Sequence, residues 1–385
     1  MRKNVIITTL AAVTLMLTSC SSTEDGQDGI AEVPSIPPGS LLTLKPEVGG
    51  HNQPNQVYVD LRTNTTKVVR RDSWDFGFYC GEDFRVILNG SVKMSTKALN
   101  STNIDEVQSI DNSILISSPG PNTTEVTKAS LGYVDNPSGK LKEDNGQKGS
   151  GTAIAEISAN DSENKVYLVS MGYEISNKNP QPGSIDLTGE HRGWKKIRIL
   201  KRANGYLLQY ADLADTQHKE FFIEKDSEYN FKFFSIKANN TVDVQPKKKD
   251  WDMCFTTNYT YTALVANAPF DKQFVYFFPD LIQLNVHGDV RAAGLQVDRY
   301  EKEKIFQAYT LEKANKINFE RLDRINQNFM ATAWRKGGLG ETAVAEDLIF
   351  VVKDSEGNKY KLIFRAVSSE SGERGHPVFQ YVLLK

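Results

Sequence analysis

The fold is decided by the stretch Tyr58-Val59-Asp60-Leu61-Arg62-Thr63-Asn64-Thr65-Thr66, which is matched by Phe233-Phe234-Ser235-Ile236-Lys237-Ala238-Asn239-Asn240-Thr241. In both stretches apolar strand residues run into an Asn-containing turn. Each then passes a basic run and reaches a Trp-Asp pair, Trp74-Asp75 in the first half and Trp251-Asp252 in the second. The same succession at two places in one chain predicts an internal repeat.

Two further matches follow in the same order. The run 161–168 resembles 354–362, and the Gly-rich run 189–193 resembles 372–375. We therefore predict a mainly β fold made of two tandem antiparallel β domains with a minor helical part, spanning residues 51–213 and 214–385. The helical part is predicted at 301–314, where apolar side chains follow a helical period better than alternation.

The repeat also suggests what the Trp-Asp pairs do. A tryptophan in an alternating strand fills a core, and an aspartate beside it accepts backbone N–H groups where the strand meets a turn. Because the pair occurs in both copies, a structural role for Trp74, Asp75, Trp251 and Asp252 is favoured over a catalytic aspartate.

The N-terminus predicts export and lipidation. Arg2 and Lys3 precede an apolar run, and Leu17-Thr18-Ser19-Cys20 follows it. A basic segment, a short apolar segment and small residues before the cleavage point are typical of a secretory signal. A cysteine directly after them is typical of a lipobox, so residues 1–19 are predicted to be removed and Cys20 to carry the lipid. Each acyl CH₂ of a palmitate-like chain contributes roughly 0.8 kcal/mol to membrane binding.

Residues 20–50 are predicted to be a flexible tether, because they are polar and rich in Gly and Pro. An acidic stretch directly after the lipidated cysteine resembles the signal that sends lipoproteins to the cell surface. The predicted location is therefore the outer membrane, facing outward.

Composition restricts the partners. The formal net charge is −2 and no basic patch stands out, which argues against nucleic acid as a partner. The 15 Tyr and 19 Phe favour strands. Cys80 and Cys254 are expected to be two buried thiols rather than a disulfide framework.

The sequence offers little for catalysis. It contains no nucleophile elbow, zinc-protease motif, phosphate-binding loop or zinc-spaced cysteine pair. Its five histidines are scattered, and only His287 follows directly on an apolar strand. A non-enzymatic protein is therefore predicted, with a hydrolase built on paired carboxylates as the least favoured alternative.

Together these landmarks resemble the HmuY family of haem-binding surface lipoproteins from Gram-negative anaerobes. The resemblance rests on the lipobox, on the Trp-Asp strands, on Trp334-Arg335, and on the terminal run in which the turn 354–358 leads to Tyr360-Lys361-Leu362-Ile363-Phe364. It is stronger from about residue 231 to 385 than in the first half. It implies a β protein that passes haem to an outer-membrane receptor of the TonB-dependent type.

The resemblance also implies where iron ligands would lie, between the Trp-Asp strand and the last hairpin. In the first repeat this interval contains Met94 and no histidine, and in the second it contains His287 and Met330. The family's second ligand falls near Lys336, which cannot bind iron while protonated. The two-histidine pattern is absent, so His287 and Met330 are the candidate axial ligands.

Two hypotheses for the ligand stay open. The first is haem or a related porphyrin, with an apolar slot built by aromatic residues of the second repeat. These residues are Phe270, Phe274, Tyr276, Phe277 and Phe278. The second is a non-haem module that kept the fold, lost the iron ligands, and binds a glycan or a protein through its many aromatic side chains.

Overall fold

The computed structural model describes residues 36–109, 133–147, 149–262, 274–319, 326–337 and 343–385. The predicted signal peptide and Cys20 lie outside the described residues. From Ser35 to Lys385 the chain forms one compact unit. Within the described ranges, none of the helices is both long enough and apolar enough to cross a membrane.

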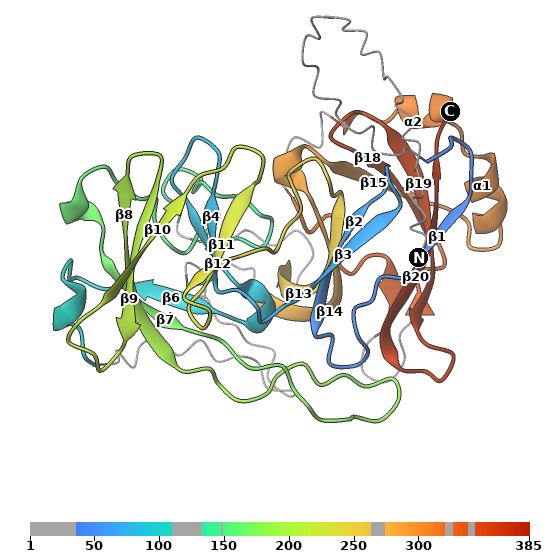
Figure 1. The fold of residues 1–385 in the computed structure, drawn as a ribbon. Helices are drawn as coiled ribbons and strands as arrows, with labels where there is room; N and C mark the ends of the chain where they lie inside the picture. The colour runs from blue at the N-terminus through green and yellow to red at the C-terminus, as the bar shows by residue number, and fades with distance from the viewer. Residues whose placement is uncertain (1–35, 110–132, 148, 263–273, 320–325, 338–342) are drawn as a thin grey trace, which may run out of the picture. The chain divides into compact units, whose positions relative to one another are not determined.

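Two pairs of antiparallel sheets make up this unit, which confirms the predicted mainly β fold. We call the first pair the first body (cyan, green and yellow strands, with β4 in light blue, in Figure 1). One of its sheets has the order β10-β9-β8-β7-β6 and the other the order β12-β11-β4-β5. Their strands are β4 Phe76–Tyr79, β5 Val86–Leu88, β6 Ser95–Ala98, β7 Val166–Ser170, β8 Trp194–Arg202, β9 Gly205–Asp212, β10 Lys219–Glu224, β11 Phe231–Ser235 and β12 Asn240–Val242.

The second pair, called the second body, has the sheet orders β1-β20-β19-β18-β15 and β14-β13-β2-β3. Its strands are β1 Leu42–Leu44, β2 Asn55–Asp60, β3 Thr65–Arg70, β13 Met253–Thr262, β14 Phe274–Leu284, β15 Arg291–Gln296, β18 Leu348–Lys353, β19 Lys359–Ser368 and β20 Arg374–Leu383. A small ladder joins β16 Arg335–Lys336 to β17 Ala343–Val344.

The helical part consists of two short helices instead of one. The predicted span 301–314 is divided into α1 Lys302–Ala308 and α2 Leu311–Asn315. The chain leaves helical geometry at Tyr309, and Thr310 caps the second helix through its side chain. Phe306 and Ala314 are the buried anchors of the two helices.

Each body holds its own apolar core between its two sheets. In the first body, Phe76 and Phe78 of β4 pack with Ile197, Tyr206 and Phe234. The second core is built in the same way, from inward-facing residues of β2, β13, β14, β18, β19 and β20. Alternating burial along these strands is what a sandwich of two sheets requires.

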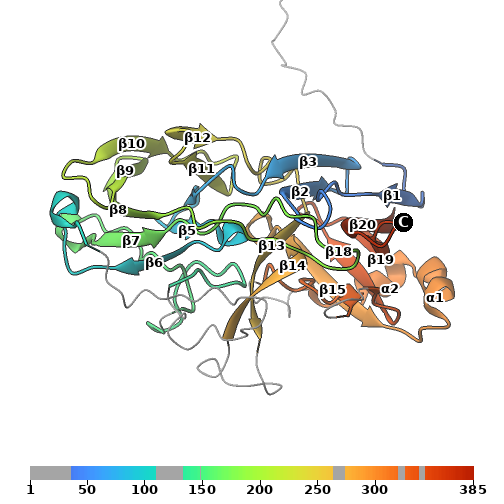
Figure 2. The same cartoon turned by 90° about the horizontal axis from the view of Figure 1, so that it is seen from below.

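The two repeats exchange their first three strands. Strand β1 lies within the predicted tether 20–50, and β2 and β3 come from the first repeat, yet β1 pairs with β20 and β2 pairs with β13. Conversely, β10 pairs with β9, and β11 pairs with β4. Figure 2 shows the blue strands β1, β2 and β3 among the orange and red strands of the second repeat. Each packed body therefore contains three strands that come from outside its own sequence repeat: β10, β11 and β12 in the first body, and β1, β2 and β3 in the second.

The exchange changes how the sequence matches are interpreted. The sheet orders place β7 in the position of β18, and β8 in the position of β19. However, the run 161–163 precedes β7, whereas the turn at 354–358 follows β18. The match between these runs, and that between 189–193 and 372–375, is therefore shifted by one strand and does not mark equivalent positions. The domain bounds 51–213 and 214–385 stay a prediction about the repeat.

Both Trp-Asp pairs make equivalent hydrogen bonds to the hairpin of the other repeat. The amide of Asp75 donates to the carbonyl of Phe234 over 2.9 Å, and its Oδ2 accepts from the amide of Ile236 at 2.7 Å. The amide of Asp252 likewise donates to Val59 over 2.7 Å, and its Oδ2 accepts from the amide of Leu61 at 2.8 Å. Each aspartate thus ties its strand to the hairpin of the other repeat.

An asparagine turn completes the symmetry. The Asn89 side chain donates to the carbonyls of Arg71 and Trp74, and Asn285 donates to those of Lys248 and Trp251. Each turn ends in a left-handed residue, at Lys93 with φ 65° and at Asp289 with φ 66°. This equivalence aligns Ser91 with His287.

Candidate functional site

A cavity of about 90 Å³ lies among residues of both bodies. Its walls come from the Trp-Asp segments, from β2, β11 and β13, from the two asparagine turns and from the segment 134–141. The lining residues used below are Gln56, Tyr58, Trp74, Met94, Asp135, Gly139, Lys140, Phe231, Phe233, Gln245, Trp251 and His287. The cavity thus sits where the equivalent parts of the two repeats meet.

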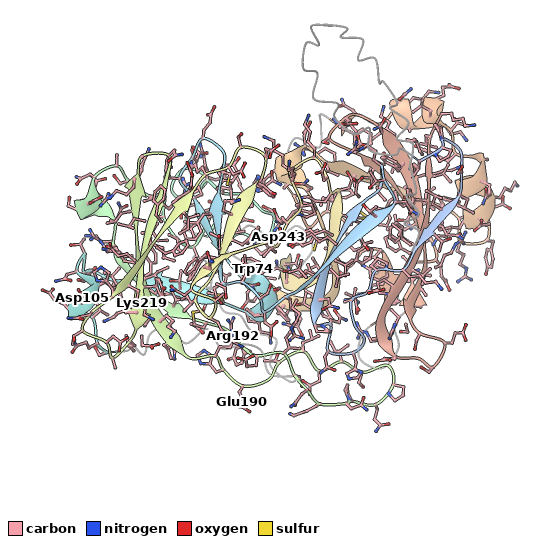
Figure 3. The ribbon with its side chains drawn as sticks, viewed as in Figure 1. Trp74, Asp105, Glu190, Arg192, Lys219 and Asp243 are labelled. Carbon is pink, nitrogen blue, oxygen red and sulfur yellow. The ribbon has the colours of Figure 1, made fainter. Side chains whose placement is uncertain are left out.

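Two crossed aromatic pairs form the wall of the cavity. The rings of Trp74 and Phe233 are 4.8 Å apart at 75°, and those of Tyr58 and Trp251 are 5.1 Å apart at 85°. Each pair joins a tryptophan of one repeat to the matching aromatic residue of the other, because Tyr58 and Phe233 hold the same place in the repeat. Edge-to-face packing at these distances stabilises both pairs. Trp74 is labelled in Figure 3, near Arg192, whose guanidinium pairs with Asp75 at 2.7 Å.

The polar partners of the two tryptophans differ. Trp74 Nε1 donates to Gln56 Oε1 over 2.8 Å. In the second repeat the place of Gln56, two residues before the aromatic partner, is taken by Phe231. Consequently Trp251 Nε1 has no acceptor among the described residues, although only 5% of this side chain is exposed.

His287 lies in the asparagine turn that follows β14. Its ring contacts Tyr79 and Phe231, with both centroid distances at 5.6 Å. Its Nε2 is 3.0 Å from the carbonyl oxygen of Gly139, so Nε2 carries the proton and Nδ1 keeps its lone pair. Burial lowers the pKa of His287 to about 4, and the imidazole is therefore neutral at pH 7.

The structure places the candidate methionines in different surroundings. Met330 is fully buried in the core of the second body with Trp334 and does not line the cavity. Met94 is fully buried in the first body and does line it, as His287 does. The pairing of His287 with Met330 at one iron stays a prediction, and Met94 is the methionine that shares a cavity with the imidazole.

The other residues singled out in the sequence lie away from this cavity. Phe277 packs with Tyr259 in a small separate cluster, and Tyr276 contacts Phe278. Phe270 and the side chain of Phe274 lie outside the described residues. Lys336 pairs with Asp347 at 3.2 Å, so its amine is occupied by a carboxylate.

Asp135 is the carboxyl group of the cavity wall. Its oxygens accept from the amides of Leu88 at 2.6 Å and Ala153 at 2.9 Å. Burial raises the pKa of Asp135 to about 7, against the lowering effect of these two hydrogen bonds. The two thiols, Cys80 and Cys254, are buried and free, as expected.

Comparison with known proteins identifies the family. The model of the HmuY protein family matches residues 52–217 and again residues 227–381. The chain belongs to the HmuY family. The two matches confirm the tandem repeat, and at the level of the family they support a haem-binding type of surface protein.

Other comparisons add little. One solved structure, apo PinO from Porphyromonas gingivitis, is 15% identical and covers 49% of this chain and 94% of its own. Its TM-score of 0.16 is too low to carry an argument about fold or function. No curated protein matches the chain.

The cavity as described does not fit a porphyrin. Cavities for drug-sized ligands have volumes of about 300–1,000 Å³, well above the roughly 90 Å³ here. The Nε2 of His287 is engaged by Gly139, and Met330 is packed away in the core. A porphyrin could reach His287 only if the segment 134–141 moved.

Sequence analysis missed most of this site. Asp135, Gly139 and Gln245 lie in segments with no recognisable motif. Long-range packing brings Asp135 and Gly139 to the tryptophans, whereas Gln245 lies in the same connection as Trp251. One signal was present in the sequence. The alignment of the two hairpins places Gln56 opposite Phe231, and that difference marks the open Trp251.

Proposed function

We propose that this protein is a non-enzymatic, surface-anchored lipoprotein that captures haem or a related porphyrin for an outer-membrane receptor. The observation that carries the proposal is the HmuY family match over both repeats. Fold alone does not assign a ligand, so the residues must be tested directly.

His287 is the residue that best supports the haem proposal. Because its pKa is about 4, it offers a neutral imidazole at physiological pH. Release of Gly139 would free Nε2, and Met94 or Met330 would supply the second axial ligand of a His/Met pair.

Haemin titration of the purified mature protein tests the proposal. A sharpened, shifted Soret band is expected for the wild type, and His287→Ala should remove it. Met94→Ala and Met330→Ala separate the two methionines, because only the true ligand should change the spin state when it is lost. His376→Ala is the matched control, since this histidine is 43% exposed and lies outside the cavity.

A second candidate is a non-haem binding module, and the cavity itself favours it. The space is small, Nε2 of His287 is engaged by Gly139, and Met330 is packed away in the core. If the wild type gives only the broad spectrum of free haemin in both redox states, the haem proposal is wrong and this second candidate replaces it.

A further inference from the structure

A long connection of the first body reaches across to the second body. Residues 171–193 join β7 to β8, and Figure 1 shows them as the long green loop at the bottom of the molecule; we call them the arm. The amide of Gly183 in the arm donates to the carbonyl of Gly372, in the turn between β19 and β20, over 2.9 Å. The part of the arm around this contact, residues 176–186, is called the tip.

His51 holds the tip through both nitrogens of its ring. Its Nδ1 is 2.8 Å from Glu373 Oε1, and its Nε2 is 3.2 Å from the carbonyl oxygen of Lys178 in the tip. A carbonyl oxygen only accepts a hydrogen bond, and so does an ionised carboxylate. Both ring nitrogens must therefore donate, which only the doubly protonated imidazolium does. Loss of one proton would turn a nitrogen lone pair toward one of these oxygens.

The carboxyl group of Glu373 stays ionised while an imidazole titrates. His376 Nε2 is 3.1 Å from its other oxygen, and His376 and His51 hold the pKa of Glu373 below its usual range. Among the described residues around His51, Glu373 is the charged side chain that bonds to its ring. The other charged side chains of the contacting segments belong to Glu47, Lys178, Asp186, Glu370 and Arg374, and the last of these pairs with Asp280.

The remaining contacts of the arm do not titrate near neutral pH. Asn52 Nδ2 donates to the carbonyls of Ser176 at 2.6 Å and Asp186 at 3.0 Å. The Arg71 guanidinium donates to the carbonyl of Leu187 at 2.5 Å. Burial lowers the pKa of Arg71 to about 10, so it remains charged. The base of the arm is therefore held at any pH near neutrality, and titration of His51 acts on the tip.

The tip also covers apolar side chains. Ile185 packs against the cluster that contains Tyr259, Val275 and Phe277, at the β13–β14 hairpin. We propose that the arm is a pH-controlled strap, in which protonation of His51 fastens the tip to the second body. Deprotonation at higher pH loosens the tip and withdraws Ile185 from the cluster. This device does not depend on haem binding.

Amide hydrogen exchange of the purified protein, without haemin, tests the strap. Imidazole side chains change their charge at about pH 6.5, so exchange is compared between about pH 5.5 and about pH 8. Each rate is divided by the intrinsic rate at the same pH, which gives a protection factor. That of Gly183 should fall about tenfold at the higher pH, because a charged hydrogen bond is lost. Gly189, whose amide donates to Glu174 within the base over 2.8 Å, should keep its protection factor.

Three variants identify the group that titrates. His51→Gln keeps an amide donor but cannot gain a proton, so the protection of Gly183 should no longer change with pH. Glu373→Gln offers His51 a neutral acceptor, which stabilises the imidazolium less and should move the response to lower pH. His376→Gln is the matched control. His376 lies at the same carboxylate, but among the described residues no hydrogen bond joins it to the arm, so the response should persist.

Four results would overturn the proposal. They are equal protection of Gly183 at both pH values in the wild type, a pH response that survives in His51→Gln, a response that disappears in His376→Gln, and an equal loss of protection at Gly189. A negative haemin titration leaves the proposal standing, because the exchange experiment contains no haemin.

Discussion

At the residue scale, each Trp-Asp pair joins two functions in adjacent side chains. The tryptophan closes the wall between the repeats, and the aspartate fastens the hairpin that comes from the other repeat. Trp74-Asp75 lies directly before β4 and Trp251-Asp252 directly before β13, and the two side chains of each pair contact different parts of the molecule. A change of the tryptophan should therefore affect the packing of the aromatic wall, and a change of the aspartate should affect its hydrogen bonds to the other hairpin.

We expect Trp251→Ala to lower the free energy of unfolding by about 3–5 kcal/mol, the range for truncating a buried aromatic side chain. Trp74→Ala should be at the upper end of this range, because it also leaves the Gln56 oxygen without its donor. Urea unfolding followed by circular dichroism measures both. A loss below 1 kcal/mol for either variant would mean that the ring is not part of the packed wall.

His287 should make the protein less stable in acid. Its pKa is about 4 in the folded chain, below the ordinary value of 6.5 that applies when the chain is unfolded. Its stabilising contribution is therefore complete above pH 6.5 and is lost as the pH falls toward 4.

His287→Gln cannot take up a proton, so its unfolding midpoint in urea should change less between pH 7 and pH 4.5 than that of the wild type. If the urea midpoints of the two proteins fall by the same amount between pH 7 and pH 4.5, the imidazole is solvated in the folded state.

The sequence predicted the repeat and the Trp-Asp segments because both depend on local pattern. It could not predict which hairpin pairs with which strand. The hairpins of Tyr58 and Phe233 follow the same pattern, so the pattern alone does not say which Trp-Asp segment each hairpin joins. The shifted matches at 161–168 and 189–193 have the same origin, since turn residues recur wherever a chain reverses.

At the element scale, the three exchanged strands make the second body discontinuous. The first body is one uninterrupted segment from β4 to β12, and its core residues all lie between Phe76 and Phe234. The second body needs β1, β2 and β3 from one end of the chain and β13 to β20 from the other.

The exchange predicts which fragments fold. A fragment of residues 72–246 should fold cooperatively, because it contains both sheets of the first body. A fragment of residues 51–213 matches the sequence repeat but lacks β10, β11 and β12, so it should expose unpaired edges of β4 and β9 and aggregate. Thermal unfolding and gel filtration of both fragments check this. Cooperative unfolding of 51–213 as a monomer would contradict the exchange.

At the scale of the whole molecule, the predicted lipid anchor remains to be tested. Leu17-Thr18-Ser19-Cys20 motivates the experiment. The mature protein should begin at an acylated Cys20, and Cys20→Ala should release it from the membrane fraction because no acyl chain can then be attached. Mass spectrometry and fractionation measure the two outcomes. An alanine variant that still sediments with the outer membrane would show that something other than lipid holds it.

The pairing of Leu42 with Tyr381 also has a consequence for the order of synthesis. The first strand to leave the ribosome, β1, waits for β20, which is translated last, whereas the first body can close as soon as β12 has emerged. Contacts between such distant parts of a chain form slowly. Strand β1 is therefore the strand that stays unpaired the longest, and this is the interval in which a chaperone or a protease would encounter it.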